Sequence, residues 1–177
     1  GPAGGRFVYD LRRRFDLFCK LSPLIPRRQL WPANRLKPEY LHGVDCMVVR
    51  DNAAGIYQGT WHAETCPERG RVAHHSFSYA ESEVLRIVDV AARIAERRQR
   101  RLTVVVKDGG IPTVSDLWRE CATAIARQRE IELSFLNVDY AVYRMLHSPS
   151  ELDVLVAPNM FGDLLIDLGG ILTGSRG

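Results

Sequence analysis

Two aspartates near the end of the chain, Asp163 and Asp167, have the type and spacing of a metal-binding pair. They are four residues apart, so a helix that opens at Gly162 places both carboxylates on one face, one turn apart. Carboxylate oxygens at that spacing can share a divalent cation. The preceding residues 153–157 are mostly apolar and predict a short buried strand. The alternative is that the pair only stabilises the helix start, where the helix dipole favours aspartate.

The elements that must position this pair alternate between strands and helices. Strands are expected at 44–50, 102–106, 133–138 and 153–157, and helices at 81–100 and 114–128. Residues 102–106 are apolar or β-branched without interruption, which is typical of a strand buried on both faces. The alternation predicts an α/β fold with a largely parallel sheet flanked by helices. Residues 59–77 lack a helical period and are expected to form an arm or loop.

Charged residues stand at or just after the ends of four predicted strands. They are Arg50, Lys107, Asp139 and the pair Asp163 and Asp167. Because the carboxyl ends of parallel strands meet at one edge of a sheet, we expect these side chains to gather there. Taken singly, each of them fits a solvated loop residue better than a site residue.

Composition excludes several classes of protein. The 177 residues are 46% hydrophobic with a net charge of +3, enough for one substantial core. No apolar run approaches the roughly 20 residues of a membrane span. The arginine cluster at 97–101 lies at the predicted end of a helix, where cations complement the dipole, so we expect no nucleic-acid partner. Four scattered cysteines without Cys-x-x-Cys spacing favour reduced thiols in a cytoplasmic protein.

Five ordered segments resemble the metal-dependent β-decarboxylating dehydrogenases, the family of isocitrate, 3-isopropylmalate, homoisocitrate and tartrate dehydrogenases. Residues 159–167 read Asn-x-Phe-Gly-Asp-x-Leu-x-Asp, and residues 50–59 read Arg-Asp-x-x-x-Gly-x-Tyr-x-Gly. The other three segments begin at Leu11, Val106 and Asp139. Within this family, the five segments most resemble those of the 3-isopropylmalate dehydrogenase-like members.

The resemblance implies a role for each charged residue. Arg12 and Arg50 would bind substrate carboxylates, for which guanidinium forks are suited. Tyr57 would be the general acid and Lys107 the catalytic base. Lys107 and Asp139 would come from the partner subunit, so that a homodimer shares its active site. The ligands of Mg²⁺ or Mn²⁺ would be Asp139, Asp163 and Asp167.

The implied reaction is the oxidation and decarboxylation of a 2-hydroxy dicarboxylic acid, with NAD in preference to NADP. The chain would be an internal fragment that is inactive when isolated. Residues 1–17 would be the edge of the large domain, and residues 18–173 the central dimerisation and catalytic domain. Residues 59–77 would be its intersubunit arm, and residues 174–177 would begin the return to the large domain.

Several positions depart from the family pattern. Ser22 stands where the family has a second carboxylate-binding arginine, Gly109 where it has an asparagine near the nicotinamide, and Asp51 where it has a glutamate. The departures leave open which 2-hydroxy acid is the substrate. They also leave open a non-catalytic, dimerising homologue that keeps the scaffold.

Histidines gather in the predicted arm. His74 and His75 are adjacent, and His62 lies twelve residues earlier. Adjacent residues of an extended strand point to opposite sides, so we expect contacts within the arm rather than a metal site.

Overall fold

The computed structural model describes residues 2–175, and side chains from residue 7 onward. Parts of the segments 1–17 and 174–177, namely residues 1, 176 and 177, lie outside the described residues. The α-helices are α1 (Pro2–Arg14), α2 (Pro38–Leu41), α3 (Glu81–Glu96), α4 (Pro112–Arg129), α5 (Val138–His147) and α6 (Asn159–Thr173). The strands are β1 (Cys19–Leu24), β2 (Cys46–Asp51), β3 (Thr60–Cys66), β4 (Gly70–Ser76), β5 (Arg101–Val106), β6 (Glu132–Asn137) and β7 (Val154–Ala157).

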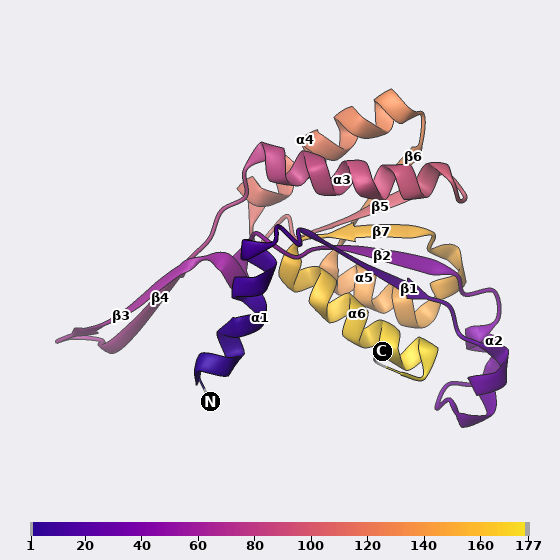
Figure 1. Cartoon of the computed structure of the whole chain (residues 1–177), viewed down its shortest axis with the longest axis horizontal. Helices are drawn as coiled ribbons and strands as arrows, with labels where there is room; N and C mark the ends of the chain where they lie inside the picture. The colour runs from indigo at the N-terminus through magenta and orange to yellow at the C-terminus, as the bar shows by residue number, and fades with distance from the viewer. Residues whose placement is uncertain (1, 176–177) are drawn as a thin grey trace.

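Five strands form one sheet in the order β1-β2-β7-β5-β6 (Figure 1). The four strands from β2 to β6 are parallel, and only β1 runs antiparallel to its neighbour β2. Helices α3 and α4 cover one face of the sheet, while α5 and α6 cover the other (Figure 1). This confirms the predicted α/β fold with a largely parallel sheet.

The core has two layers because β5 and its neighbours are buried on both faces. Val104 packs with α3 and α4 around the fully buried Trp118. Val105, the next residue, packs on the opposite side with α5 and α6. The uninterrupted apolar run of β5 therefore follows from a strand that has a core on each side.

The first sheet strand, β1, is an edge strand that the sequence pattern did not predict. It contains Pro23, which has no amide hydrogen and is tolerated in a sheet chiefly at edges. Lys20 in the same strand is exposed. β1 holds its place by pairing with β2 over six residues, from Cys19 opposite Asp51 to Leu24 opposite Cys46.

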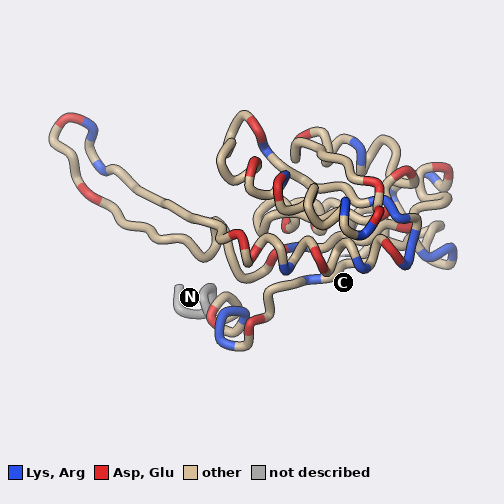
Figure 2. The backbone as a smooth tube through the Cα atoms, turned by 90° about the horizontal axis from the view of Figure 1, so that it is seen from above, with Lys and Arg blue, Asp and Glu red and all other residues tan. Residues whose placement is uncertain are grey.

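The predicted arm is an isolated hairpin of β3 and β4 that projects from the body (Figure 1), and it stands apart from the body in the perpendicular view as well (Figure 2). Nearly every residue of both strands is exposed. A two-stranded hairpin on its own is marginally stable in water.

Helix α3 ends four residues before the predicted position. The reason is Asp153, whose side chain is fully buried ahead of β7. Its carboxylate accepts hydrogen bonds from Arg98 Nε at 2.7 Å and from the Gln99 amide at 3.0 Å. The chain then turns through Arg100, which has a φ of +58°, and enters β5. Arg98, from the arginine cluster at 97–101, thus connects the end of α3 to the residue that precedes β7.

Among residues 2–175, we find no helix with both the length and the apolarity needed to cross a membrane.

Replacing Asp153 by alanine should lower the free energy of unfolding by about 3 kcal/mol, because the Arg98 guanidinium and the Gln99 amide lose a buried partner. Asp45 is the matched control, since it also pairs with Arg98 but is 53% exposed. Asp45→Ala should cost below about 1 kcal/mol. Urea unfolding measures both variants, and equal losses would contradict the role given to Asp153.

Candidate active site

Arg50, at the carboxyl end of β2, is a buried guanidinium with only 2% of its surface exposed. Its Nε and Nη2 donate to Asn159 Oδ1 at 3.1 and 2.8 Å, and its Nη1 forms an ion pair with Asp163. Asn159 in turn donates from Nδ2 to the Ala54 carbonyl at 2.9 Å. A buried guanidinium stays charged and requires such partners. The start of α6 is therefore held to the end of β2.

The glycine in the Phe-Gly-Asp sequence has a packing reason. A Cβ at Gly162 would lie 2.6 to 2.7 Å from the side-chain carbons Cγ and Cβ of Arg50. Only glycine lets the arginine stem pass across α6 at this distance. The helix also begins at Asn159 rather than at Gly162, so it opens three residues earlier than predicted.

Asp163 and Tyr57 lie together beside Arg50. The Tyr57 hydroxyl donates to Asp163 Oδ2 at 3.2 Å, and the Arg50 guanidinium stands 5.9 Å from the Tyr57 ring centre. Burial, followed by the neighbouring Asp163, raises the pKa of Tyr57. The phenol therefore holds its proton more tightly than an ordinary tyrosine, which is itself protonated at neutral pH.

Arg12, near the end of α1, adds a second positive charge to this group. Its pKa is lowered, first by burial and then by the charge of Arg50. Its guanidinium carbon lies 5.1 Å from the centre of the Tyr9 ring, and its Nη1 is buried without a hydrogen-bond partner in the structure. A buried guanidinium nitrogen of this kind is suited to an acceptor brought by a ligand.

Tyr79 and Asn159 also support this group, although the sequence pattern assigned neither a role. The Tyr79 hydroxyl accepts a hydrogen bond from the Asn159 amide at 3.0 Å and donates to the buried Asp51 at 3.4 Å. Burial raises the pKa of both Tyr79 and Asp51. Gly55 has a φ of +76°, and a Cβ there would meet the Tyr79 hydroxyl at 2.1 Å. In the sequence, Asn159 is the first residue of the Asn-x-Phe-Gly-Asp segment that resembles the family, but the sequence assigns it no contact or role.

Lys107 and Asp139 form a separate pair at the same edge of the sheet. Lys107 follows β5 and Asp139 lies in the first turn of α5, directly after β6. Lys107 Nζ and Asp139 Oδ1 are 2.7 Å apart, with side chains 41% and 68% exposed. The hydrogen bond from Lys107 is the main cause that lowers the pKa of Asp139. Lys107 also borders an apolar pocket of about 180 Å³ with Tyr79, Ile111 and Phe161.

The seven predicted residues therefore divide into two groups within one chain. Arg12, Arg50, Tyr57 and Asp163 lie together, and Asp167 follows one turn later on α6, exposed. The three predicted metal ligands do not form a group within one chain. In the described part of the chain, the only set of three potential ligands whose atoms all lie within 4.8 Å of one another is on the arm. Asp139 would have to come from elsewhere to complete a site with Asp163 and Asp167.

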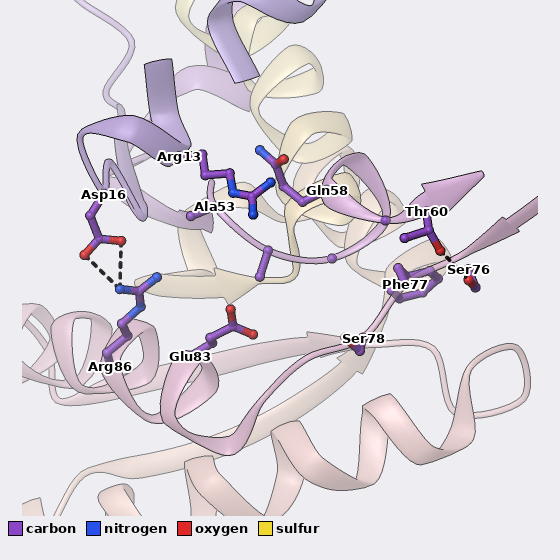
Figure 3. Close-up of a pocket in the computed structure, with 13 residues that line it drawn as sticks. Arg13, Asp16, Ala53, Gln58, Thr60, Ser76, Phe77, Ser78, Glu83 and Arg86 are labelled. Atoms are coloured by element: carbon purple, nitrogen blue, oxygen red, sulfur yellow. Dashed lines mark hydrogen bonds and ion pairs between the residues drawn. The ribbon is translucent and has the colours of Figure 1, made fainter. Parts of the chain in front are cut away.

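A larger polar cavity of about 500 Å³ lies nearby, between the residues that follow α1 and the start of α3 (Figure 3). Arg13, Gln58 and Glu83 line it, and Arg86 Nη1 pairs with both carboxylate oxygens of Asp16 at 2.9 and 3.0 Å. It contains none of the seven predicted residues, so it marks the junction of α1 with the body rather than the Arg50 group.

The sequence model of the isocitrate/isopropylmalate dehydrogenases matches residues 5–177. The chain belongs to this family. It is 37% identical over 174 residues to 3-isopropylmalate dehydrogenase of Methylococcus capsulatus, a match that covers 97% of this chain and 48% of that protein. With the Synechococcus sp. 3-isopropylmalate dehydrogenase the identity is 40% over 174 residues, or 97% of this chain and 45% of that protein. The chain spans about half the length of the curated relatives it matches.

Solved structures share the fold. The isocitrate dehydrogenase of Methylococcus capsulatus superimposes with a TM-score of 0.84 at 27% identity, covering 96% of this chain and 48% of that one. The TT0538 protein of Thermus thermophilus gives a TM-score of 0.82 at 25% identity, covering 94% of this chain and 32% of that one.

Two departures from the isocitrate/isopropylmalate dehydrogenase pattern have no structural cause. A Cβ at Gly109 meets nothing within 4 Å, so the backbone and its surroundings do not demand glycine. Ser22 lies in the edge strand β1, opposite Val48 of β2. The structure gives no reason for serine at this position.

Replacing Lys107 by methionine should raise the pKa of Asp139 toward the ordinary aspartate range, because the hydrogen bond that lowers it is lost. In the unchanged chain, the ion pair is complete above the ordinary aspartate pKa and is lost as pH falls through the lowered one. Carboxyl ¹³C NMR during a pH titration measures this shift.

Asp108 is the internal control for that titration. Its pKa is also lowered, chiefly by a hydrogen bond from Arg119, and this pair does not involve Lys107. An Asp139 pKa that stays low in Lys107→Met, while Asp108 is unchanged, would contradict the pairing.

Proposed function

We propose that this chain carries the substrate-binding and proton-transfer residues of an NAD-dependent dehydrogenase that oxidises and decarboxylates a 2-hydroxy dicarboxylic acid. The substrate would be of the 3-isopropylmalate, isocitrate or tartrate type. The observation that carries the proposal is the grouping of Arg12, Arg50 and Tyr57 around Asp163 at the carboxyl edge of the sheet. Such an edge is where open α/β sheets bind ligands. Family membership supports the reaction class.

In this proposal the two arginines bind the substrate and the tyrosine donates a proton. Arg50 is fixed by Asn159, and Arg12 has a buried nitrogen without a partner, so the two can present positive charge to a dianionic substrate. Tyr57 keeps its proton because burial raises its pKa, and it would give that proton to the carbon that CO₂ leaves. Lys107 Nζ would take the proton of the substrate hydroxyl.

The donor set fits a hard divalent cation. Asp163 and Asp167 offer only carboxylate oxygens, which Mg²⁺ and Mn²⁺ prefer, and Asp139 would supply a third. When bound, the cation would draw charge from the substrate oxygens, and NAD, in preference to NADP, would accept the hydride.

A homodimer would complete the site, and the exposed apolar surface of α5 and α6 supports this proposal. Helices α5 and α6 carry large exposed apolar side chains next to the candidate ligands. These are Tyr140 and Tyr143 with Leu146 on α5, and Leu164 with Ile171 on α6. Tyr143 lies one helical turn after Asp139, and Leu164 directly follows Asp163. An interface between two copies over these helices would bring Asp139 and Lys107 of one copy to Asp163 of the other.

The hairpin of β3 and β4 supports the same arrangement, because it projects from the body and is exposed on both faces (Figures 1 and 2). We propose that it is the intersubunit arm of this dimer. The four cysteines, all among the described residues, form no disulfide, which fits the reducing cytoplasm that we propose as its location.

Subunit mixing tests the shared site in the complete polypeptide in which these residues occur. Lys107→Met and Asp163→Asn should each abolish NADH formation with Mn²⁺ and any of 3-isopropylmalate, isocitrate, homoisocitrate and tartrate. A heterodimer of the two variants contains one site with both residues intact. Random one-to-one mixing should therefore restore about a quarter of the unchanged activity.

The control replaces the Asp163→Asn subunit by one that carries both Lys107→Met and Asp163→Asn. Mixed with Lys107→Met, this double variant leaves no intact site in any heterodimer, so no activity should return. No recovery in the first mixture, with heterodimers shown by native mass spectrometry, would exclude a shared site. No turnover of any substrate by the unchanged dimer would favour the non-catalytic homologue instead.

Replacing Leu164 by aspartate should shift the dimer toward monomers, because a charge then enters the apolar surface of α5 and α6. We expect at least about a tenfold higher dissociation constant, equivalent to about 1.4 kcal/mol, by analytical ultracentrifugation. Tyr40→Asp is the control, since Tyr40 is similarly exposed at 47% but lies on α2. A dimer that both changes leave intact would place the interface elsewhere.

A further inference from the structure

A group of three potential ligands lies on the arm, away from the candidate active site. His62 and Glu64 belong to β3 and His74 to β4. Each offers one ligand atom, and the three atoms lie within 4.8 Å of one another. His74 Nε2 and Glu64 Oε1 are 3.0 Å apart, and all three side chains are exposed.

The register of the hairpin puts the three side chains on one face. His62 pairs directly with His74 across the two strands, and their rings stack with centroids 4.4 Å apart. Glu64 follows His62 by two positions, so it points to the same side. His75 points to the other face, where it stacks on Trp61. The adjacent histidines therefore diverge, as the sequence predicted, but a histidine from the opposite strand takes the place of one of them.

The geometry points to a metal site, and we propose that His62, Glu64 and His74 bind a divalent transition-metal ion, with Zn²⁺ as the preferred metal. Two imidazoles and one carboxylate form a ligand set that zinc adopts with three protein ligands and one open position. Tetrahedral bonds of about 2.1 Å place ligand atoms roughly 3.4 Å apart, close to the spacing of His74 and Glu64. Exposed side chains reach this geometry by small rotations.

The chemistry distinguishes this site from the carboxylate pair on α6. Imidazole nitrogens favour Zn²⁺, Cu²⁺, Ni²⁺ and Co²⁺, whereas Asp163 and Asp167 offer oxygen alone, which favours Mg²⁺ and Mn²⁺. The two sites are thus separable by choice of ion, and the arm site does not depend on the proposed reaction.

Bound metal would cross-link the two strands of the arm. It joins β3 to β4 through side chains where the hairpin has no packed core of its own, as the exposure of both strands indicates. Metal binding to such a segment stabilises its folded form. The arm would then be more rigid with zinc than without it.

Calorimetric titration of the 177-residue chain with ZnCl₂, in buffer with excess MgCl₂, tests the proposal. One Zn²⁺ per chain should bind. His62→Ala and His74→Ala should each weaken binding at least about tenfold, and Glu64→Gln should weaken it as well. His147→Ala and Glu68→Gln are matched controls outside the set, and neither should change the affinity. Circular dichroism checks that each variant is folded.

Two further readouts locate the ion and its effect. Paramagnetic Co²⁺ should broaden the imidazole NMR signals of His62 and His74 but not those of His42 and His147. Zn²⁺ should slow amide hydrogen exchange in β3 and β4 of the unchanged chain, and not in the double variant His62→Ala with His74→Ala. Absent Zn²⁺ binding, one ion per two chains, or binding that the double variant retains would each overturn the proposal.

Discussion

The buried charge of Arg50 is the constraint on which the candidate site depends. A guanidinium does not lose its proton in a protein interior, so every structure that buries it must supply acceptors. Asn159 and Asp163 do so from α6, the helix that follows the central strand β7. The arginine stem then occupies the space that a side chain at position 162 would need. One charge thus ties the start of α6 to β2 and leaves room only for glycine at position 162 of the helix that carries the candidate metal ligands.

The sequence predicted those parts of the structure that follow from local pattern. The uninterrupted apolar run of β5 and the three-to-four periodicity of α3 are visible in the chain, and both elements are present. Charged residues such as Arg50 and Lys107 do stand at strand ends, as expected from the sequence. The edge strand β1 was missed because half of its six residues are exposed and Pro23 interrupts it, so it has no clear strand pattern.

Other features depend on pairs of residues that are distant in sequence, which a single sequence does not reveal. Asn159 belongs to a family-like segment of the sequence, but its contacts with Arg50 and Ala54 are visible only in the structure. The end of α3 depends on Asp153, more than fifty residues later in the chain. The grouping of His62 with His74 depends on the register of the hairpin, which the turn and strand pairing decide.

Opposite charges are paired within each half of the candidate site. Arg50 lies against Asp163, and Lys107 lies against Asp139. Each ion pair is therefore close to electrically neutral before any ligand arrives. The two pairs differ in burial, because Arg50 is almost fully covered whereas Lys107 and Asp139 are largely exposed.

The edge strand β1 also affects how copies of this chain can aggregate. An open sheet edge can template the addition of strands from other molecules, which leads to fibres. Here a strand added beside β1 would meet Pro23, which has no hydrogen to donate, and the exposed charge of Lys20. Edge-to-edge growth is therefore disfavoured at β1.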